Sequence, residues 1–254
     1  MKLKKHKMPS ILFIDSGIGG LSTLSETMKI LKVNYIYFAD NEFAPYGSKS
    51  DLSLRERLSL IISQTIQKYS ISMVVLACNT ATTSSVNFLR KKFPTLTFVG
   101  TEPACKLASD NNFNNPIVIA TPRTISHIIN PKIKAISCPE LASLIENKYI
   151  QNSPKSNLLL LKQLYLLKQQ IQDYDCLILG CTHYSFIKHQ LIKMINVPIF
   201  DGNHGVSKQI ARLCNQKLAK FPTCKIILSR YNSITLQKYK KILNQILANQ
   251  INLC

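Results

Sequence analysis

The longest apolar run of the chain falls well short of the roughly eighteen residues that a membrane-spanning helix needs. The basic start, Met1 to Ser10, leads into an apolar run that stops at Asp15, too short for the apolar part of a secretion signal. No low-complexity tract interrupts the sequence. We therefore expect a cytoplasmic protein, without a membrane partner, whose eight cysteines are reduced thiols rather than four disulfides.

Acidic residues are scarce. Only 13 Asp and Glu oppose 32 Lys and Arg, which gives a formal net charge of +19, and only six of the basic residues are arginine. The lysines are scattered along predicted helices and cluster only at Lys2 to Lys7 and Lys238 to Lys241. Because no arginine-rich motif or zinc-ligand spacing accompanies them, the charge indicates a solvated lysine-rich surface and argues against a nucleic-acid partner. It would still favour the approach of an anionic small molecule.

Several signatures of other protein classes are absent. No metal is assigned, because the spacing of metal ligands is missing around His6, His127, His189 and His204. The glycine-rich run from Asp15 to Gly20 lacks the lysine and hydroxyl residue that end a phosphate-binding P-loop, which disfavours a kinase or an ATPase. Cys176 and Cys181 do not have the C-x-x-C spacing of a redox pair.

Strand and helix patterns alternate along the chain, and 46% of the residues are apolar, enough for substantial cores. This order predicts an α/β protein with mostly parallel sheets flanked by helices and a site at the carboxyl ends of the strands. The predicted strands are Ile11–Ile14, Tyr35–Phe38, Met73–Ala77, Leu96–Val99, Ile117–Ala120, Ile133–Ser137, Leu177–Gly180, Pro198–Phe200 and Lys225–Leu228. The first predicted helix follows the glycine-rich run and ends at about Lys32. The other main predicted helices are Asp51–Tyr69, Thr82–Lys92, Ser156–Gln170, Gly205–Ala219 and Thr235–Ala248.

The pattern restarts in the middle of the chain. Thr121 follows Asp15 by 106 residues, and Cys181 follows Cys78 by 103. Such a constant offset predicts two similar lobes related by a pseudo-two-fold axis, with the active site in the cleft between them. We expect residues 1–99 and 205–254 to form a discontinuous first lobe, and residues 100–204 to form the second.

Two cysteines occupy matched positions in the two halves. Each ends an apolar run and precedes a hydroxyl-rich turn, in Val74-Val75-Leu76-Ala77-Cys78-Asn79-Thr80 and in Leu177-Ile178-Leu179-Gly180-Cys181-Thr182-His183. A thiol at a helix N-terminus is expected to have a lowered pKa, because the helix dipole favours the thiolate. Two such thiols facing one cleft could exchange protons with one carbon from opposite sides, and inversion of a stereocentre requires this arrangement. Backbone N–H groups around Asp15 and after each cysteine could hold carboxylates.

These segments resemble the glutamate racemases, which interconvert L- and D-glutamate without a cofactor. The resemblance runs in order from residue 11 to about residue 210 and includes the final strand and helix. Its motifs are Asp15-Ser16-Gly17-Ile18-Gly19-Gly20, Ala39-Asp40-Asn41 with Pro45-Tyr46-Gly47, Ala77-Cys78-Asn79-Thr80-Ala81, Glu102-Pro103 and Gly180-Cys181-Thr182-His183-Tyr184. The family supplies D-glutamate for bacterial peptidoglycan, and the resemblance implies the same role and a homodimer.

The resemblance also implies a role for individual residues. Cys78 would handle the proton on the D-glutamate face with the help of Asp15, and Cys181 the proton on the L face with the help of His183. Glu146 matches a carboxylate that the family places near its second cysteine. The substrate would be bound by Asp15, Ser16, Tyr46, Gly47, Asn79, Thr80, Thr121, Thr124, Thr182 and His183.

Two positions depart from the family pattern. Ser185 stands where proline is usual, and Arg123, whose guanidinium could contact a carboxylate or face solvent, lies between Thr121 and Thr124. Several alternatives stay open at this level. Asp15 could merely cap a helix, Tyr46 could be packing, and Glu146 could be solvated. Aspartate or a hydantoin-like compound could replace glutamate as the substrate. Aspartate is shorter than glutamate by one methylene, which changes the binding free energy by only ~1–3 kcal/mol.

Overall fold

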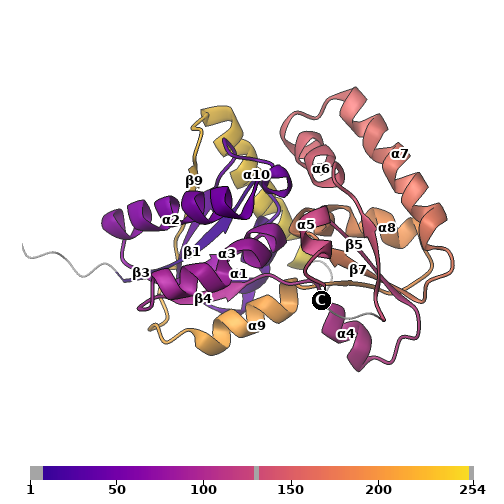
Figure 1. Cartoon of the computed structure of the whole chain (residues 1–254). Helices are drawn as coiled ribbons and strands as arrows, with labels where there is room; N and C mark the ends of the chain where they lie inside the picture. The colour runs from indigo at the N-terminus through magenta and orange to yellow at the C-terminus, as the bar shows by residue number, and fades with distance from the viewer. Residues whose placement is uncertain (1–7, 129–131, 252–254) are drawn as a thin grey trace, which may run out of the picture.

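The computed structural model of the chain describes residues 8–128 and 132–251. It contains two separate parallel sheets, each flanked by helices, as the alternating pattern predicts (Figure 1). The basic cluster Lys2 to Lys7, His6 and Cys254 lie outside the described residues. Within the described ranges, the structure has no helix with the length and apolar character to cross a membrane.

The first sheet has five strands in the order β4-β3-β1-β2-β9, all parallel. Alternate side chains of its central strand enter two cores: Ile11 and Phe13 pack under α1, α9 and α10, and Leu12 and Ile14 pack under α2 and α3. Both faces are therefore buried, as is typical of a parallel sheet. The elements are β1 Ser10–Asp15, β2 Asn34–Ala39, β3 Ile71–Leu76, β4 Thr97–Gly100, β9 Cys224–Leu228, α1 Leu21–Ile30, α2 Asp51–Lys68, α3 Asn79–Lys92, α9 Asn203–Leu213 and α10 Ser233–Ile251.

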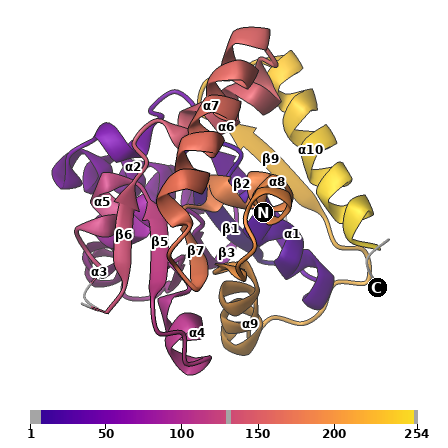
Figure 2. The same ribbon diagram turned by 90° about the vertical axis from the view of Figure 1, so that its right-hand side faces the viewer.

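The second sheet has four parallel strands in the order β6-β5-β7-β8, of which β6, β5 and β7 lie side by side in Figure 2. Its larger core lies under α6, α7 and α8, and its smaller core includes Ala108 of α4. The elements are β5 Pro116–Ala120, β6 Lys134–Ser137, β7 Cys176–Gly180, β8 Ile199–Asp201, α4 Cys105–Asp110, α5 Pro122–Ile125, α6 Leu141–Ile150, α7 Pro154–Ile171 and α8 Lys188–Met194.

The order of the strands reflects the repeat in the sequence. If β5, β6, β7 and β8 are matched in turn to β1, β2, β3 and β4, the two sheets have the same strand order, and β9 is an additional edge strand of the first. After β8 the chain returns to the first sheet, because α9 packs against α1. The equivalent strands that end at Asp15 and Ala120, and at Leu76 and Gly180, carry the loops of the site.

Several details differ from the sequence predictions. Helix α9 ends at Leu213, six residues before the predicted end at Ala219. Helix α3 begins at Asn79, directly after Cys78 and three residues earlier than expected. Asp51, the predicted first residue of the second helix, could have been its cap, but Ser50 caps α2, because its hydroxyl accepts a hydrogen bond from the backbone N–H of Ser53. The segment after Cys181 is a 3₁₀ helix, η2 (Thr182–Ile187), before α8 begins, so the two cysteines do not precede the same kind of helix. The short helices α4, α5 and α8 had no periodic signal long enough to predict them.

Candidate active site

The two lobes meet through the loops that follow β1, β3, β5 and β7. Hydrogen bonds at these loops cross between the lobes. The hydroxyl of Thr182 donates to Asp15 Oδ2 at 3.2 Å, the hydroxyls of Thr80 and Thr121 lie 3.1 Å apart, and the N–H of Ile18 donates to a Glu146 carboxylate oxygen at 2.8 Å. Residues from both halves of the repeat therefore form one site.

Cys78 is the candidate catalytic thiol of the first lobe. It is 6% exposed and lies at the N-terminus of α3. Burial raises its pKa well above the usual value, and the negative charges of Asp15 and Cys181 raise it further. The backbone N–H groups of Ala81 and Thr80 act in the opposite direction, as expected at a helix start. The expectation of a lowered thiol pKa is therefore wrong for Cys78, because desolvation exceeds the effect of the helix. Charge on Cys181 therefore contributes to the electrostatic environment of Cys78.

Cys181, His183 and Glu146 form a chain of contacts in the second lobe. The Sγ of Cys181, a residue 7% exposed, lies 4.0 Å from His183 Nδ1, and His183 Nε2 lies 2.8 Å from Glu146 Oε2. Burial by itself lowers the pKa of His183, but the hydrogen bonds with Cys181 and Glu146 raise it well above the usual value. A protonated His183 between a sulfur and a carboxylate can stabilise a thiolate and exchange protons with it.

Asp15 is fully buried at the end of β1. Its Oδ1 accepts the N–H of Gly17 at 2.7 Å, and its Oδ2 accepts the hydroxyl of Thr182. Burial raises its pKa to about 6, although the charge of His183 and these hydrogen bonds act in the opposite direction. A carboxyl group with such a pKa can hold or release a proton near neutral pH.

Hydroxyl groups gather beside the thiols. Thr121 Oγ1 lies 3.0 Å from Thr124 Oγ1 and 3.1 Å from Thr80 Oγ1, and all three residues are buried. Gly47 lies against Thr121, since a Cβ on this glycine would be 3.8 Å from that of Thr121. The structure therefore brings together four of the predicted substrate-binding residues, two from each lobe.

Two other predicted binding residues hold the surrounding loops. The side chain of Asn79 donates to the carbonyl of Thr101, and the hydroxyl of Tyr46 donates to Asp40 at 3.0 Å. Asp40 also accepts N–H groups from Nε and Nη2 of Arg57, a part-buried ion pair that was not predicted from the sequence. Asp40 lies in one of the recognised motifs and could have suggested an ion pair, but Arg57 is distant in sequence, on α2, and no local pattern connects the two residues.

A cavity of about 340 Å³ opens beside these residues. Its wall includes Ser16, Gly17 and Pro45 from the first lobe and Glu146 and His183 from the second. Ser16 and His183 are thus predicted binding residues that line this cavity. Within residues 8–128 and 132–251, no group of three or more His, Cys, Asp or Glu side chains could hold a metal ion, and the seven cysteines found there are free thiols.

Arg123, the first departure from the family pattern, joins the lobes. Its guanidinium forms an ion pair with Asp51 at the start of α2 and donates to the carbonyl of Lys49. Of the two possibilities open at the sequence level, contact with a carboxylate is confirmed, but the carboxylate belongs to the protein's own Asp51.

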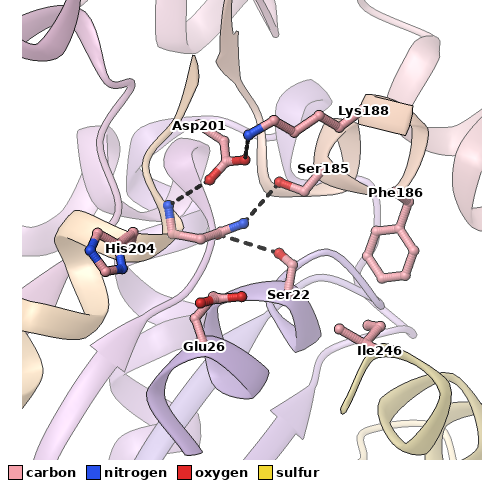
Figure 3. A pocket seen from close by; sticks show the side chains of 9 residues that line it. Ser22, Glu26, Ser185, Phe186, Lys188, Asp201, His204 and Ile246 are labelled. Carbon is pink, nitrogen blue, oxygen red and sulfur yellow. Dashed lines mark hydrogen bonds and ion pairs between the residues drawn. The ribbon is translucent and has the colours of Figure 1, made fainter. Parts of the chain in front are cut away.

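Ser185, the second departure, borders another cavity of about 340 Å³ (Figure 3). Its hydroxyl accepts the side-chain N–H of Asn203 at 3.0 Å. The carbonyl oxygen of that amide accepts the hydroxyls of Thr23 at 2.7 Å and Ser22 at 3.4 Å. Asn203 therefore connects α1 of the first lobe to η2, the 3₁₀ helix that follows Cys181.

The chain is similar in sequence to glutamate racemases. The glutamate racemase of Clostridium botulinum is 34% identical over 219 residues, which cover 81% of this chain and 83% of that protein. No model of a known protein family matches the chain. The chain belongs to the glutamate racemase family.

Solved structures of glutamate racemases have the same fold. The Escherichia coli enzyme in complex with L-glutamate and the activator UDP-MurNAc-Ala superposes with a TM-score of 0.78, at 26% identity, over 94% of this chain and 96% of that one. The Francisella tularensis enzyme in complex with D-glutamate gives a TM-score of 0.73, at 25% identity, over 95% and 94% of the two chains. The predicted glutamate racemase fold, two parallel sheets flanked by helices, is confirmed.

Proposed function

We propose that the protein racemises glutamate by transferring protons between the α-carbon and two thiols, Cys78 and Cys181. One observation carries the proposal. The two cysteines follow equivalent strands of two sheets with the same strand order, and hydrogen bonds join the residues beside them across the lobes, Thr80 with Thr121 and Thr182 with Asp15. Membership of the glutamate racemase family supports glutamate as the substrate.

The protonation states fit the conversion of L- to D-glutamate. Cys181, which lies beside the protonated His183, would act as the base that removes the α-proton from the L face. The raised pKa of Cys78 keeps this thiol protonated, so that it can deliver its proton to the opposite face. One proton leaves the carbon and another arrives, and the two thiols exchange their protonation states.

The reverse reaction would use the same groups in opposite roles. Cys78 would then act as the base on D-glutamate, and Asp15, with its pKa of about 6, would accept or return the proton of that thiol. Cys181, assisted by His183, would protonate the L face.

The carboxylates and the ammonium group of the substrate need polar partners in the cleft. We assign this role to Ser16, Gly47, Thr80, Thr121, Thr124 and Thr182, with Asn79 and Tyr46 shaping the loops that carry them. N–H groups at the start of α3 would stabilise the negative charge that develops on the substrate. Glu146 would orient His183.

We further propose the biological setting that the family implies. The protein would act in the cytoplasm as a homodimer, without a cofactor, and supply D-glutamate for peptidoglycan. Its first lobe would comprise residues 1–99 and 205–254, and its second lobe residues 100–204; the packing of α9 on α1 and the pairing of β9 with β2 support this division.

The decisive experiment follows circular dichroism with L- or D-glutamate, and with aspartate in parallel, without added cofactor. We expect glutamate to racemise in both directions and the Cys78→Ala and Cys181→Ala variants each to lose turnover. Cys214→Ala, a half-buried thiol in the core beneath α9, serves as the matched control and should retain activity. Full turnover in both single variants would exclude the two-thiol mechanism, and preference for aspartate would exclude glutamate as the substrate.

A further inference from the structure

Tyr239 is a buried residue of α10 whose hydroxyl group reaches the second lobe. The residue is fully buried in the core of the first sheet, with its ring 6.4 Å from that of Tyr37. Its hydroxyl donates to Glu146 Oε1 at 3.0 Å, across 93 residues of sequence. Burial and the charge of Glu146 keep its pKa well above the usual value, so the hydroxyl remains a donor at neutral pH.

The two oxygens of the Glu146 carboxylate have different partners. Oε2 accepts the backbone N–H of Ile18 and faces His183 Nε2, both at 2.8 Å, whereas Oε1 meets the hydroxyl of Tyr239. The terminal torsion of a glutamate side chain is soft, so its carboxylate rotates unless both oxygens are held. The hydroxyl of Tyr239 fixes one oxygen and thereby directs the other toward His183.

We propose that Tyr239 is a positioning residue for the Cys181 half of the reaction. It acts through Glu146 and His183 to hold the imidazole next to the sulfur of Cys181. The contacts run in one line, from the hydroxyl of Tyr239 to Glu146, to His183 Nε2, and from His183 Nδ1 to Cys181 Sγ at 4.0 Å. The proposal rests on the two-thiol racemase function proposed above.

The Cys78 half has different supports. Asp15, its proposed partner, is held by the N–H of Gly17 and the hydroxyl of Thr182. Removal of the Tyr239 hydroxyl should therefore slow proton transfer at Cys181 more than at Cys78. An unequal effect on the two faces distinguishes positioning from a general loss of folded protein.

The test compares Tyr239→Phe with Tyr35→Phe. Tyr35 is a matched control because it lies in the same core, almost fully buried, and its hydroxyl donates to the carbonyl of Leu31 at the end of α1. Both variants lose one buried hydroxyl, so their thermal unfolding reveals any common loss of stability. Only Tyr239→Phe should lower kcat/KM, by about tenfold, as expected for a lost hydrogen bond to a charged group. The loss of kcat/KM should be the same for both enantiomers. The ratio of the two kcat/KM values equals the equilibrium constant, which is one because L- and D-glutamate are equally stable.

Kinetic isotope effects on kcat/KM distinguish positioning from a structural defect, because a structural defect would leave them unchanged. With glutamate deuterated at the α-carbon, the isotope effect on kcat/KM of Tyr239→Phe should rise for the L enantiomer, whose deuterium Cys181 removes. It should fall for the D enantiomer, because the slower protonation at Cys181 then limits the rate. The effects refer to turnover by folded molecules, so partial unfolding leaves them unchanged.

Each outcome decides the proposal. Wild-type kcat/KM and unchanged isotope effects in Tyr239→Phe would refute it, and so would a loss of activity equal to that of Tyr35→Phe. Absence of racemisation in the wild-type protein would instead refute the proposed function. As a second check, adding Tyr239→Phe to Glu146→Gln should lower kcat/KM by less than about twofold, since residues acting through one group are not additive. A full tenfold further loss would show that Tyr239 acts independently of Glu146.

Discussion

Replacement of Asp15 by asparagine should stabilise the protein at neutral pH while it lowers activity. Asp15 is fully buried, and burial raises the pKa of its carboxyl group from 3.8 to about 6. The folded state therefore disfavours the carboxylate. An asparagine in the same place carries no charge, its oxygen can still accept the N–H of Gly17, and its amide can donate to the hydroxyl of Thr182.

The sign and the size of the effect follow from the two pKa values. Between pH 3.8 and about 6 the folded wild-type protein binds more protons at Asp15 than the unfolded chain, so the stability that this group contributes falls as the pH rises. The difference corresponds to about 3 kcal/mol above pH 6, at about 1.4 kcal/mol for each pKa unit. Asp15→Asn should gain about this much free energy of unfolding at pH 7 and almost nothing below pH 3.8.

Urea unfolding from pH 3.5 to pH 8 measures this difference. The free energy of unfolding of Asp15→Asn minus that of wild type should increase through the interval and level off above about pH 7. Asp110→Asn, an exposed residue at the end of α4, is the control and should give a flat difference. A flat or decreasing difference for Asp15→Asn would refute the claim that the charged form of Asp15 destabilises the folded state. An undiminished kcat in the same variant would remove Asp15 from the proton transfer.

Two further predictions concern contacts that join the lobes. Arg123→Ala removes the ion pair with Asp51 and the hydrogen bond to Lys49. It should speed amide hydrogen exchange in the segment Tyr46–Lys49 several-fold and lower the free energy of unfolding by at most about 1 kcal/mol. An exchange rate as slow as that of the exposed control Lys91→Ala would contradict this prediction. Asn203→Leu leaves the buried hydroxyl of Thr23 and that of Ser185 without this amide and should lower the free energy of unfolding by about 2 kcal/mol in urea. Equal stability of the leucine variant and wild type would show that the amide network contributes nothing.

The strands and the location of the site were the most predictable features. Buried parallel strands are short apolar runs, and Ile11–Ile14 and Leu177–Gly180 differ by only one or two residues from β1 and β7. The chemistry follows from topology, because a polar residue that comes directly after a buried parallel strand must lie at the carboxyl edge of the sheet. Asp15, Cys78 and Cys181 could therefore be grouped from the sequence alone.

The electrostatic state of the site was less predictable. A local pattern shows that Cys78 precedes a helix, but it does not show how deeply the surrounding core buries the residue. In the structure, desolvation and the neighbouring negative charges exceed the effect of the helix dipole, and the pKa rises. The sequence pattern also gave no reason to expect a 3₁₀ helix after Cys181, since α and 3₁₀ turns begin with the same residue types.

Contacts through α10 show why the two halves of a repeat need not have equal chemistry. The strand order that the sheets share delivers a thiol to the cleft from each side, but α10 packs on α1 and also touches α6. That additional contact brings the hydroxyl of Tyr239 to Glu146, in the half that holds His183. The half that holds Cys78 uses a buried carboxyl group instead, so one thiol faces an imidazolium and the other faces Asp15. The two sulfurs therefore have unlike partners, and proton transfer in one direction across a stereocentre likewise requires unlike roles, a base on one face and an acid on the other.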